Sequence, residues 1–164
     1  MKKSPKKNIV YVTPYYPPYG AGGAERTCAM HADILTHCGY AVTVITLNYG
    51  DEPTHEKVGA INVIRVPAPR LDGIGTQIGA GLFKRPSFWW YLYRQIIKEL
   101  KGQDIACIHA QNAQVYMSSY LVSRWLNIPL VAHIRDTASI CSLGGICLME
   151  RGTSQPPATC SVFK

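Results

Sequence analysis

The sequence predicts one α/β domain built on a doubly wound, mostly parallel sheet. Short apolar and β-branched runs alternate along the 164 residues with segments whose apolar residues recur at helical spacing. Strands that alternate with helices imply parallel strands joined by right-handed crossovers. With 47% apolar residues the chain can bury a sizeable core, but it is too short for two domains of ordinary size.

We place this domain at residues 8–140. A basic arm, residues 1–7, precedes it, and residues 141–164 follow as a loop that contains Cys, Gly and Pro. We expect the domain to be truncated there, without the helices that should complete its last layer.

The first half of the domain predicts three strands and one helix. Apolar and β-branched runs predict strands at residues 9–12, 41–47 and, as an edge strand, 61–66. Between the first two strands, apolar residues at helical spacing predict a helix that Gly39 ends in a left-handed conformation. A glycine-rich loop at residues 71–81 leads to the second half.

The second half predicts two more strands, at residues 104–110 and 129–134, with a helix before each. The first helix opens at Pro86 and carries one apolar stripe, formed by Phe88, Leu92, Ile96 and Leu100. The second helix runs from about residue 113 to 126, and Asn112 is placed to cap it.

The architecture indicates where a ligand should bind. In open parallel sheets, ligands bind beyond the carboxyl ends of the strands, where the strand order reverses. Three segments meet that condition: the loop after Val12, the HAQN segment from His109 to Asn112, and the segment that begins with Arg135 and Asp136.

The loop from Tyr15 to Arg26 reads YYPPYGAGGAER and lies between the first strand and the first helix. Glycines let backbone amides approach a ligand closely, and the helix directs its free amides and positive dipole end to the same place. The loop therefore suits an anion, although a tight turn alone would explain the glycines equally well. It is not the dinucleotide fingerprint, because Glu25 stands where the third glycine belongs, so NAD binding is disfavoured.

Charge and composition exclude several classes of protein. The formal net charge is +7, and four of the lysines that contribute to it lie in the arm at residues 1–7, which we interpret as solvated. We therefore expect no nucleic-acid partner. Because no apolar run reaches 18 residues and no signal-peptide core follows the basic start, we expect a cytoplasmic protein. Cys28, Cys38 and Cys107 lie within apolar patterns, which favours reduced, buried thiols over a disulfide framework.

Four segments in order resemble one family. Residues 15–26, the following HCGYAVTVIT, then KGQDIACIHAQN and NIPLVAHIRD are similar to the proline-rich turn, GG-x-E element and strand ends of retaining glycosyltransferases with the GT-B fold (family 4, or group 1). The resemblance covers Asn8 to about Gly152 and concerns their Rossmann-like N-terminal domain. It implies sugar transfer with retention, from a nucleotide sugar to a carbohydrate or lipid-linked acceptor, without a metal or other cofactor.

In that family the N-terminal domain binds the acceptor and closes over the donor diphosphate, while a second domain holds most of the nucleotide sugar. The paired glutamates of that second domain are absent from these residues, so we expect the chain to be catalytically incomplete. An alternative is a stand-alone α/β module that binds a phosphate-bearing small ligand. A natural stop at Lys164 would favour the module, and continuation into a second domain would favour the transferase.

The resemblance also assigns residues on the donor side. Gly22 and Gly23 would place their amides against the diphosphate or the transferred sugar. Glu25 belongs to the same donor-binding element, or it serves only as a favourable charge near the helix dipole. On the acceptor side the resemblance assigns Tyr16 and Asn112.

Three residues are implied as catalytic: His109, Arg135 and Asp136. His109 is either a structural histidine or part of the acceptor cleft. Many relatives have histidine where this chain has Arg135, and arginine cannot accept a proton at neutral pH, so Arg135 would bind an anion or orient a sugar hydroxyl. By strand alternation, His133 lies on the same side as Arg135 but deeper.

Two further segments leave alternatives open. The segment from Phe83 to Gln95 combines aromatic and basic residues, so it could contact a membrane at the inner face, or its aromatics could simply cover the sheet, which we favour. In the tail, Cys141, Cys147 and Cys160 are separated by five and twelve residues with no C-x2-C pair, so free thiols are favoured over structural zinc.

Overall fold

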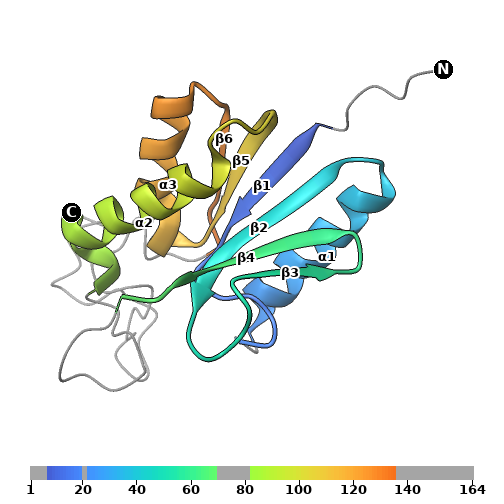
Figure 1. Ribbon diagram of the computed structural model, residues 1–164, viewed down its shortest axis with the longest axis horizontal. Helices are drawn as coiled ribbons and strands as arrows, with labels where there is room; N and C mark the ends of the chain where they lie inside the picture. The colour runs from blue at the N-terminus through green and yellow to red at the C-terminus, as the bar shows by residue number, and fades with distance from the viewer. Residues whose placement is uncertain (1–6, 20–21, 70–81, 136–164) are drawn as a thin grey trace, which may run out of the picture.

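The computed structural model describes residues 7–19, 22–69 and 82–135 of the chain (Figure 1). These residues form a six-stranded sheet in the order β3-β4-β2-β1-β5-β6, and every neighbouring pair is parallel except β3 and β4. The strands are β1 (Asn8–Val12), β2 (Ala41–Asn48), β3 (His55–Val58), β4 (Ile61–Pro67), β5 (Ile105–Gln111) and β6 (Leu130–His133). The helices are α1 (Gly23–His37), α2 (Pro86–Leu100), α3 (Ala113–Leu126) and the short 3-10 turn η1 (Leu82–Lys84).

The helices cover both faces of the sheet, which confirms the doubly wound, mostly parallel α/β fold. Figure 1 shows α2 and α3 packed together on one face and α1 on the other. The larger core cluster lies between the sheet and the α2–α3 layer, and the smaller one lies under α1. The apolar stripe predicted for α2 is confirmed, because Phe88, Leu92, Ile96 and Leu100 are all buried.

The chain reverses its direction of winding between β1 and β5. From β1 the chain passes through α1 to β2 on one side, and α2 later carries it from β4 to β5 on the other side of β1. The carboxyl ends of β1 and β5 therefore flank the crevice where ligands bind in folds of this kind.

The end of α1 follows its prediction. Gly39 has a φ of +91°, and the amides of Gly39 and Tyr40 donate to the carbonyls of Thr36 and Leu35 at 3.0 and 3.1 Å. This pair of bonds is the Schellman arrangement, which satisfies carbonyls that the helix leaves free.

Two sequence predictions were wrong. Residues 61–66 are not an edge strand, because the short polar strand β3 pairs antiparallel with β4 outside it. The HEKV sequence of β3 has no apolar alternation, since this outermost strand is largely exposed. The prediction of buried thiols holds for Cys28 alone: Cys38, the C-cap residue of α1, is exposed, and Cys107 is half-buried, although all three described cysteines are free thiols as predicted.

Within the described ranges, no helix combines the length and apolarity needed to cross a bilayer. The same part of the chain contains no group of three or more His, Cys, Asp or Glu side chains placed to hold a metal ion. The arm at 1–7, apart from its last residue, the loop at 71–81 and the tail cysteines lie outside the described residues.

Candidate functional site

The proline- and tyrosine-rich part of the first loop is held by the loop after β2. The rings of Tyr15 and Tyr49 stack at 5.0 Å with an interplanar angle of 18°, and the Tyr49 hydroxyl donates to the Pro14 carbonyl at 3.0 Å. The Tyr19 hydroxyl donates to the Glu52 carboxylate. This aromatic packing fixes the path of the chain from β1 toward α1.

A buried arginine anchors the same loop from below. Arg65 of β4 is only 1% exposed, pairs with the Glu56 carboxylate and donates to the Pro17 carbonyl at 2.7 Å. Beside it, Tyr16 is 2% exposed and packs in the core cluster under α1. Burial is the main cause that raises the pKa of Tyr16 to about 12, so its hydroxyl stays protonated.

The N-terminus of α1 is built around Gly22, Gly23 and Glu25. Gly22 is the N-cap residue, and no side chain caps the amides of the first turn. The Glu25 carboxylate is buried and folds back toward Gly22, where a Cβ would lie 2.5 Å from its Oε2 atom. A Cβ on Gly23, by contrast, would meet nothing within 4 Å. A side chain at Gly22 would therefore force the Glu25 carboxylate to move, while the space beside Gly23 is open.

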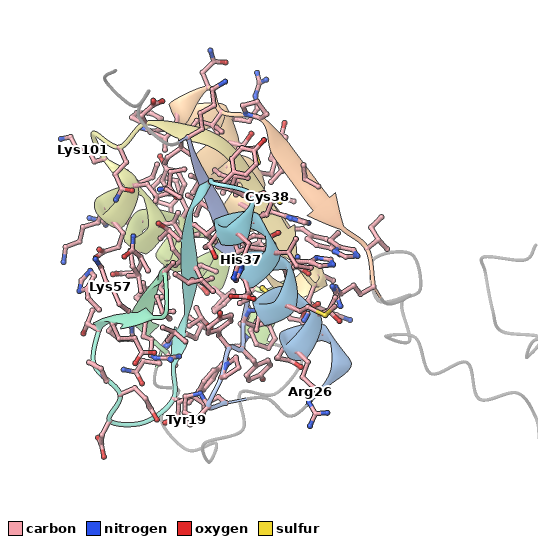
Figure 2. The ribbon with its side chains drawn as sticks, turned by 90° about the vertical axis from the view of Figure 1, so that its right-hand side faces the viewer. Tyr19, Arg26, His37, Cys38, Lys57 and Lys101 are labelled. Atoms are coloured by element: carbon pink, nitrogen blue, oxygen red, sulfur yellow. The ribbon has the colours of Figure 1, made fainter. Side chains whose placement is uncertain are left out.

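Figure 2 shows α1 lengthwise across the sheet. Tyr19 and Arg26 lie at the end where the parallel strands terminate, and His37, Cys38 and Lys101 lie toward or at the opposite end. Arg26 extends away from the molecule and is exposed, so the groups that line the site come from the inner side of α1 and from the strands.

The carboxyl end of β5 places polar side chains in the crevice. Gln111 is fully buried, and Asn112 follows with φ 74° and ψ 149°, a combination that residues other than glycine rarely adopt. Asn112 is the N-cap residue of α3 by position, but its side chain makes no capping bond. Its Oδ1 atom is buried and has no hydrogen-bond partner among the described residues. Strain of this kind is characteristic of functional sites.

Three imidazoles from three elements stack beside this strand end. The His109 ring lies 5.6 Å from that of His133 of β6, which lies 6.1 Å from that of His31 of α1. On its other side the His109 ring is 4.7 Å from the ring of Tyr11. These distances are between ring centroids, and they make one continuous row across the face of the sheet that α1 covers.

The imidazoles of β5 and β6 are held neutral. Burial, followed by the effects of His133, His31 and Arg135, lowers the pKa of His109 to about 4. The pKa of His133 is also lowered, first by burial and then by Arg135 and His31. His109 is therefore a neutral hydrogen-bonding group at neutral pH rather than a cation.

Arg135 joins β6 to β5 at the end of this row. Its Nε donates to the amide oxygen Oε1 of Gln111 at 2.9 Å, and the Gln111 amide nitrogen lies 3.4 Å from Nε2 of His109. The Nη2 atom of Arg135 is buried without a hydrogen-bond partner, and no ion pair within the described ranges includes this residue. Among the residues that the structure describes, Arg135 is thus a cation without a counterion.

The structure brings most of the expected residues together. His109 and Arg135 are linked through Gln111, and α1 passes beside β6, because the His31 ring stacks on that of His133. Tyr16 is set apart in the core, and Asp136 lies outside the described residues.

Sequence reasoning missed Gln111 and His31. Gln111 is two positions after His109, and strand alternation places both side chains on one face, so the HAQN segment already held that signal. His31 lies three residues after Cys28, next to the inner face of the helix, but no pattern in the sequence indicates that it faces His133.

Comparison with known proteins gives the class of the chain. Residues 22–158 match the family described as the glycosyl transferase 4-like domain, so this chain belongs to that family. The predicted resemblance to the N-terminal domain of family 4 glycosyltransferases is therefore confirmed. A search of curated proteins found no significant match.

Three solved structures share the fold. Sucrose-phosphate synthase from Thermosynechococcus elongatus superposes with a TM-score of 0.65 and 15% identity, over 77% of this chain and 32% of that one. A glycosyltransferase from Rickettsia africae gives 0.50 and 17%, over 82% and 33%. The C-terminal domain of PF1911 hydrogenase from Pyrococcus furiosus gives 0.51 and 14%, over 78% and 91%. At such identities the likeness establishes the fold alone, and the chain spans about a third of the length of the first two proteins.

Proposed function

We propose that this chain is the acceptor-side domain of a retaining glycosyltransferase that takes its sugar from a nucleotide sugar. The observation that carries this proposal is that the uncapped α1 N-terminus and the unpaired Arg135 both lie at the edge of the sheet where the parallel strands end. A group with negative charge would satisfy both at once. The donor of such a reaction carries a diphosphate, and negative charge grows on it as the sugar leaves.

On the donor side, the amides at the start of α1 stabilise the departing diphosphate. Gly23 leaves open space where another residue would carry a Cβ, which allows the backbone to approach the ligand. Glu25 is folded against Gly22, so it shapes this turn and orients its backbone, and its charge suits the N-terminal end of the helix. Arg135, at the same edge of the sheet but on β6 rather than on α1, contributes a fixed positive charge toward the acceptor side, and it does not exchange protons at neutral pH.

On the acceptor side, His109 and Asn112 act as hydrogen-bonding groups. The neutral His109 ring orients a sugar hydroxyl, and the unpartnered Oδ1 of Asn112 accepts a hydrogen bond from the acceptor. Asp136, which directly follows Arg135, completes the catalytic set. Tyr16 supports the acceptor side indirectly, because its buried ring holds the loop that leads to α1.

The exposed side of α2 suits a membrane that carries a lipid-linked acceptor. Trp90 is 57% exposed and stacks on Tyr93, and the basic side chains beside them on the surface are Lys84, Arg85, Arg94 and Lys98. An aromatic pair among cations favours the interface of an anionic bilayer. We therefore propose a cytoplasmic protein that binds the inner membrane face peripherally.

The proposal also holds that a second, donor-binding domain completes the enzyme. The test compares the 164-residue chain with the full-length protein in an assay of nucleoside diphosphate release, using a panel of nucleotide sugars and lipid-linked or soluble acceptors. We expect turnover by the full-length protein, with the anomeric configuration of the sugar retained by NMR. Robust turnover by the 164-residue chain alone would contradict the incompleteness, and an inverted product would contradict the retaining mechanism.

A further inference from the structure

The row of imidazoles and Arg135 is a cluster of basic groups that the reaction above does not fully use. His31 and His133 belong to α1 and β6, and their parallel rings lie 6.1 Å apart with an interplanar angle of 7°. Neither takes part in an ion pair among the described residues, and neither does Arg135. Two of the described carboxylates pair elsewhere, Glu99 with His55 and Glu56 with Arg65, and that of Glu25 is folded back toward Gly22.

Such an arrangement is unfavourable unless an anion binds to it. Arg135 keeps a buried Nη2 without a partner, and its charge opposes protonation of both His109 and His133. Arg135 as a whole is half-buried, and a cation that is partly removed from water normally has a carboxylate or another anion beside it, because desolvation of an unpaired charge is costly. The cluster therefore has the composition of an anion-binding site, with one permanent cation and two imidazoles.

We propose that Arg135, His133 and His31 form a subsite for the phosphate group of a phosphorylated acceptor, and that the histidines take up protons as the phosphate binds. This inference rests on the proposed function, because it names the chemical class of the acceptor. The phosphate can belong to a soluble sugar phosphate or to a lipid phosphate, since the site recognises the chemistry that the two share.

Other groups around the cluster do not titrate in the same range. From β1, Tyr11 has a pKa raised to about 12, chiefly by burial, and from α1 the same cause raises the pKa of Cys28 to about 12. Burial also raises the pKa of the Cys107 thiol on β5. The nearby carboxylate is that of Glu25, which is folded back against Gly22. The imidazoles are therefore the groups of this cluster that take up protons between about pH 5 and 8.

The sign of the pH dependence follows directly. Bound phosphate offsets the repulsion from Arg135 and so raises the lowered pKa of His133 and that of His109. Affinity must then increase as the pH falls, because the protonated imidazoles bind the anion more strongly. Phosphate itself loses charge near pH 6, which would oppose this trend. Sulfate stays a dianion over the whole range, so sulfate isolates the contribution of the histidines.

The experiment follows the imidazole resonances of the full chain by NMR while inorganic phosphate, or separately sulfate, is added between about pH 5.5 and 8. The chain has five histidines. His37, which lies on the same helix as His31 but toward its other end and is exposed, serves as the matched control (Figure 2). We expect both anions to shift the imidazole resonances of His31 and His133 and to leave those of His37 unchanged, and we expect sulfate to bind more tightly at pH 6 than at pH 8.

Variants then identify the contributions. His31→Gln should weaken anion binding by about tenfold and flatten its pH dependence, whereas His37→Gln should change neither. Equal responses at His37 and His31, or no response at His31 and His133, would overturn the inference. Neither outcome would affect the proposed sugar transfer, which is measured separately with the full-length protein. The wild-type titration requires no variant, so the inference remains testable if His31→Gln does not fold.

Two further arms distinguish the source of the phosphate. A soluble sugar 1-phosphate and vesicles that contain a polyprenyl phosphate are each added to the full chain. Perturbation of His31 and His133 by the soluble compound alone assigns a free phosphorylated sugar as the acceptor, and perturbation by the vesicles alone assigns a lipid phosphate. A lack of response to both would overturn the assignment to a phosphorylated acceptor.

Discussion

Replacement of Gly23 separates a ligand-binding role of the first loop from a purely structural one. Gly23 is the first residue of α1, its φ is not in the left-handed region, and a Cβ there would meet nothing within 4 Å. Gly23→Ala therefore fits the fold. It should raise the free energy of unfolding by about 0.4–1 kcal/mol, because the unfolded chain loses conformational freedom. For a domain of this size the melting temperature should rise by about 1–4 °C.

Activity should change in the opposite direction. If the amide of Gly23 contacts the diphosphate, a side chain blocks that approach, and loss of one such donor typically costs about 100- to 1000-fold in turnover. Gly23→Val should have the larger effect because its branched Cβ is bulkier. The measurements are nucleoside diphosphate release by the full-length protein and thermal unfolding followed by circular dichroism.

The comparison variant is Gly22→Ala. Its Cβ would lie 2.5 Å from Oε2 of Glu25, so the buried carboxylate must move, and we expect changes in both stability and activity. Wild-type transfer by both Gly23→Ala and Gly23→Val would refute the ligand-binding role and reduce the loop to a turn.

Four other predictions test separate parts of the structure. Arg135→Lys should lose transfer to a similar extent from about pH 6 to 9, whereas Arg135→His should recover activity only in acid; a histidine variant most active in alkali would show that the position acts as a base. The pKa of His109 is lowered from its ordinary 6.5 to about 4, so the folded protein should lose stability as the pH falls from about 6.5 to 4. The loss should be roughly 1–2 kcal/mol after allowance for the partial exposure of the ring. In urea unfolding curves, His109→Gln should reduce this dependence of stability on pH. Leu92→Ala in the core should lower the free energy of unfolding by about 2–5 kcal/mol, and a loss below 1 kcal/mol would contradict its burial. Trp90→Ala should weaken sedimentation with anionic vesicles and leave transfer to a soluble acceptor unchanged; equal sedimentation of variant and wild type would refute the membrane contact.

The periodicity of the sequence was sufficient to predict the fold because the core depends on it. The buried runs of β1 and β2 and the stripe on α2 all follow from apolar spacing. Strand β3 was missed for the opposite reason: its partner is on one side only and its side chains are largely exposed, so burial imposes no pattern on its sequence.

The site was only partly predictable, because its contacts join residues that are distant in the sequence. Strand alternation predicted that His133 and Arg135 lie on the same side of the sheet, and the position of His109 at a strand end indicated that it is a candidate site residue. The rotation of α1 that brings His31 to His133, and the reach of Arg135 across to Gln111, depend on tertiary packing that no local pattern records. The same holds for Tyr16, whose place in the core comes from the fold of the loop beneath α1.

Arg65 and Arg135 differ in how their charges are balanced, and the difference favours a ligand-binding role over a purely structural role for Arg135. Arg65 lies under the loop, and its charge is balanced by Glu56 and by a backbone carbonyl, which is how a protein keeps a buried cation for structural purposes. Arg135 has one amide oxygen as its partner, and its charge helps to lower the pKa of His109; within the described residues it forms no ion pair with a carboxylate. Asn112 directly follows Gln111, and its strained backbone conformation costs on the order of 1–3 kcal/mol. An unpaired cation and a strained residue at the ends of neighbouring strands both reduce stability, and no structural role seen among the described residues offsets that cost. We therefore interpret both as parts of the proposed binding site, because a bound ligand would supply the missing partners.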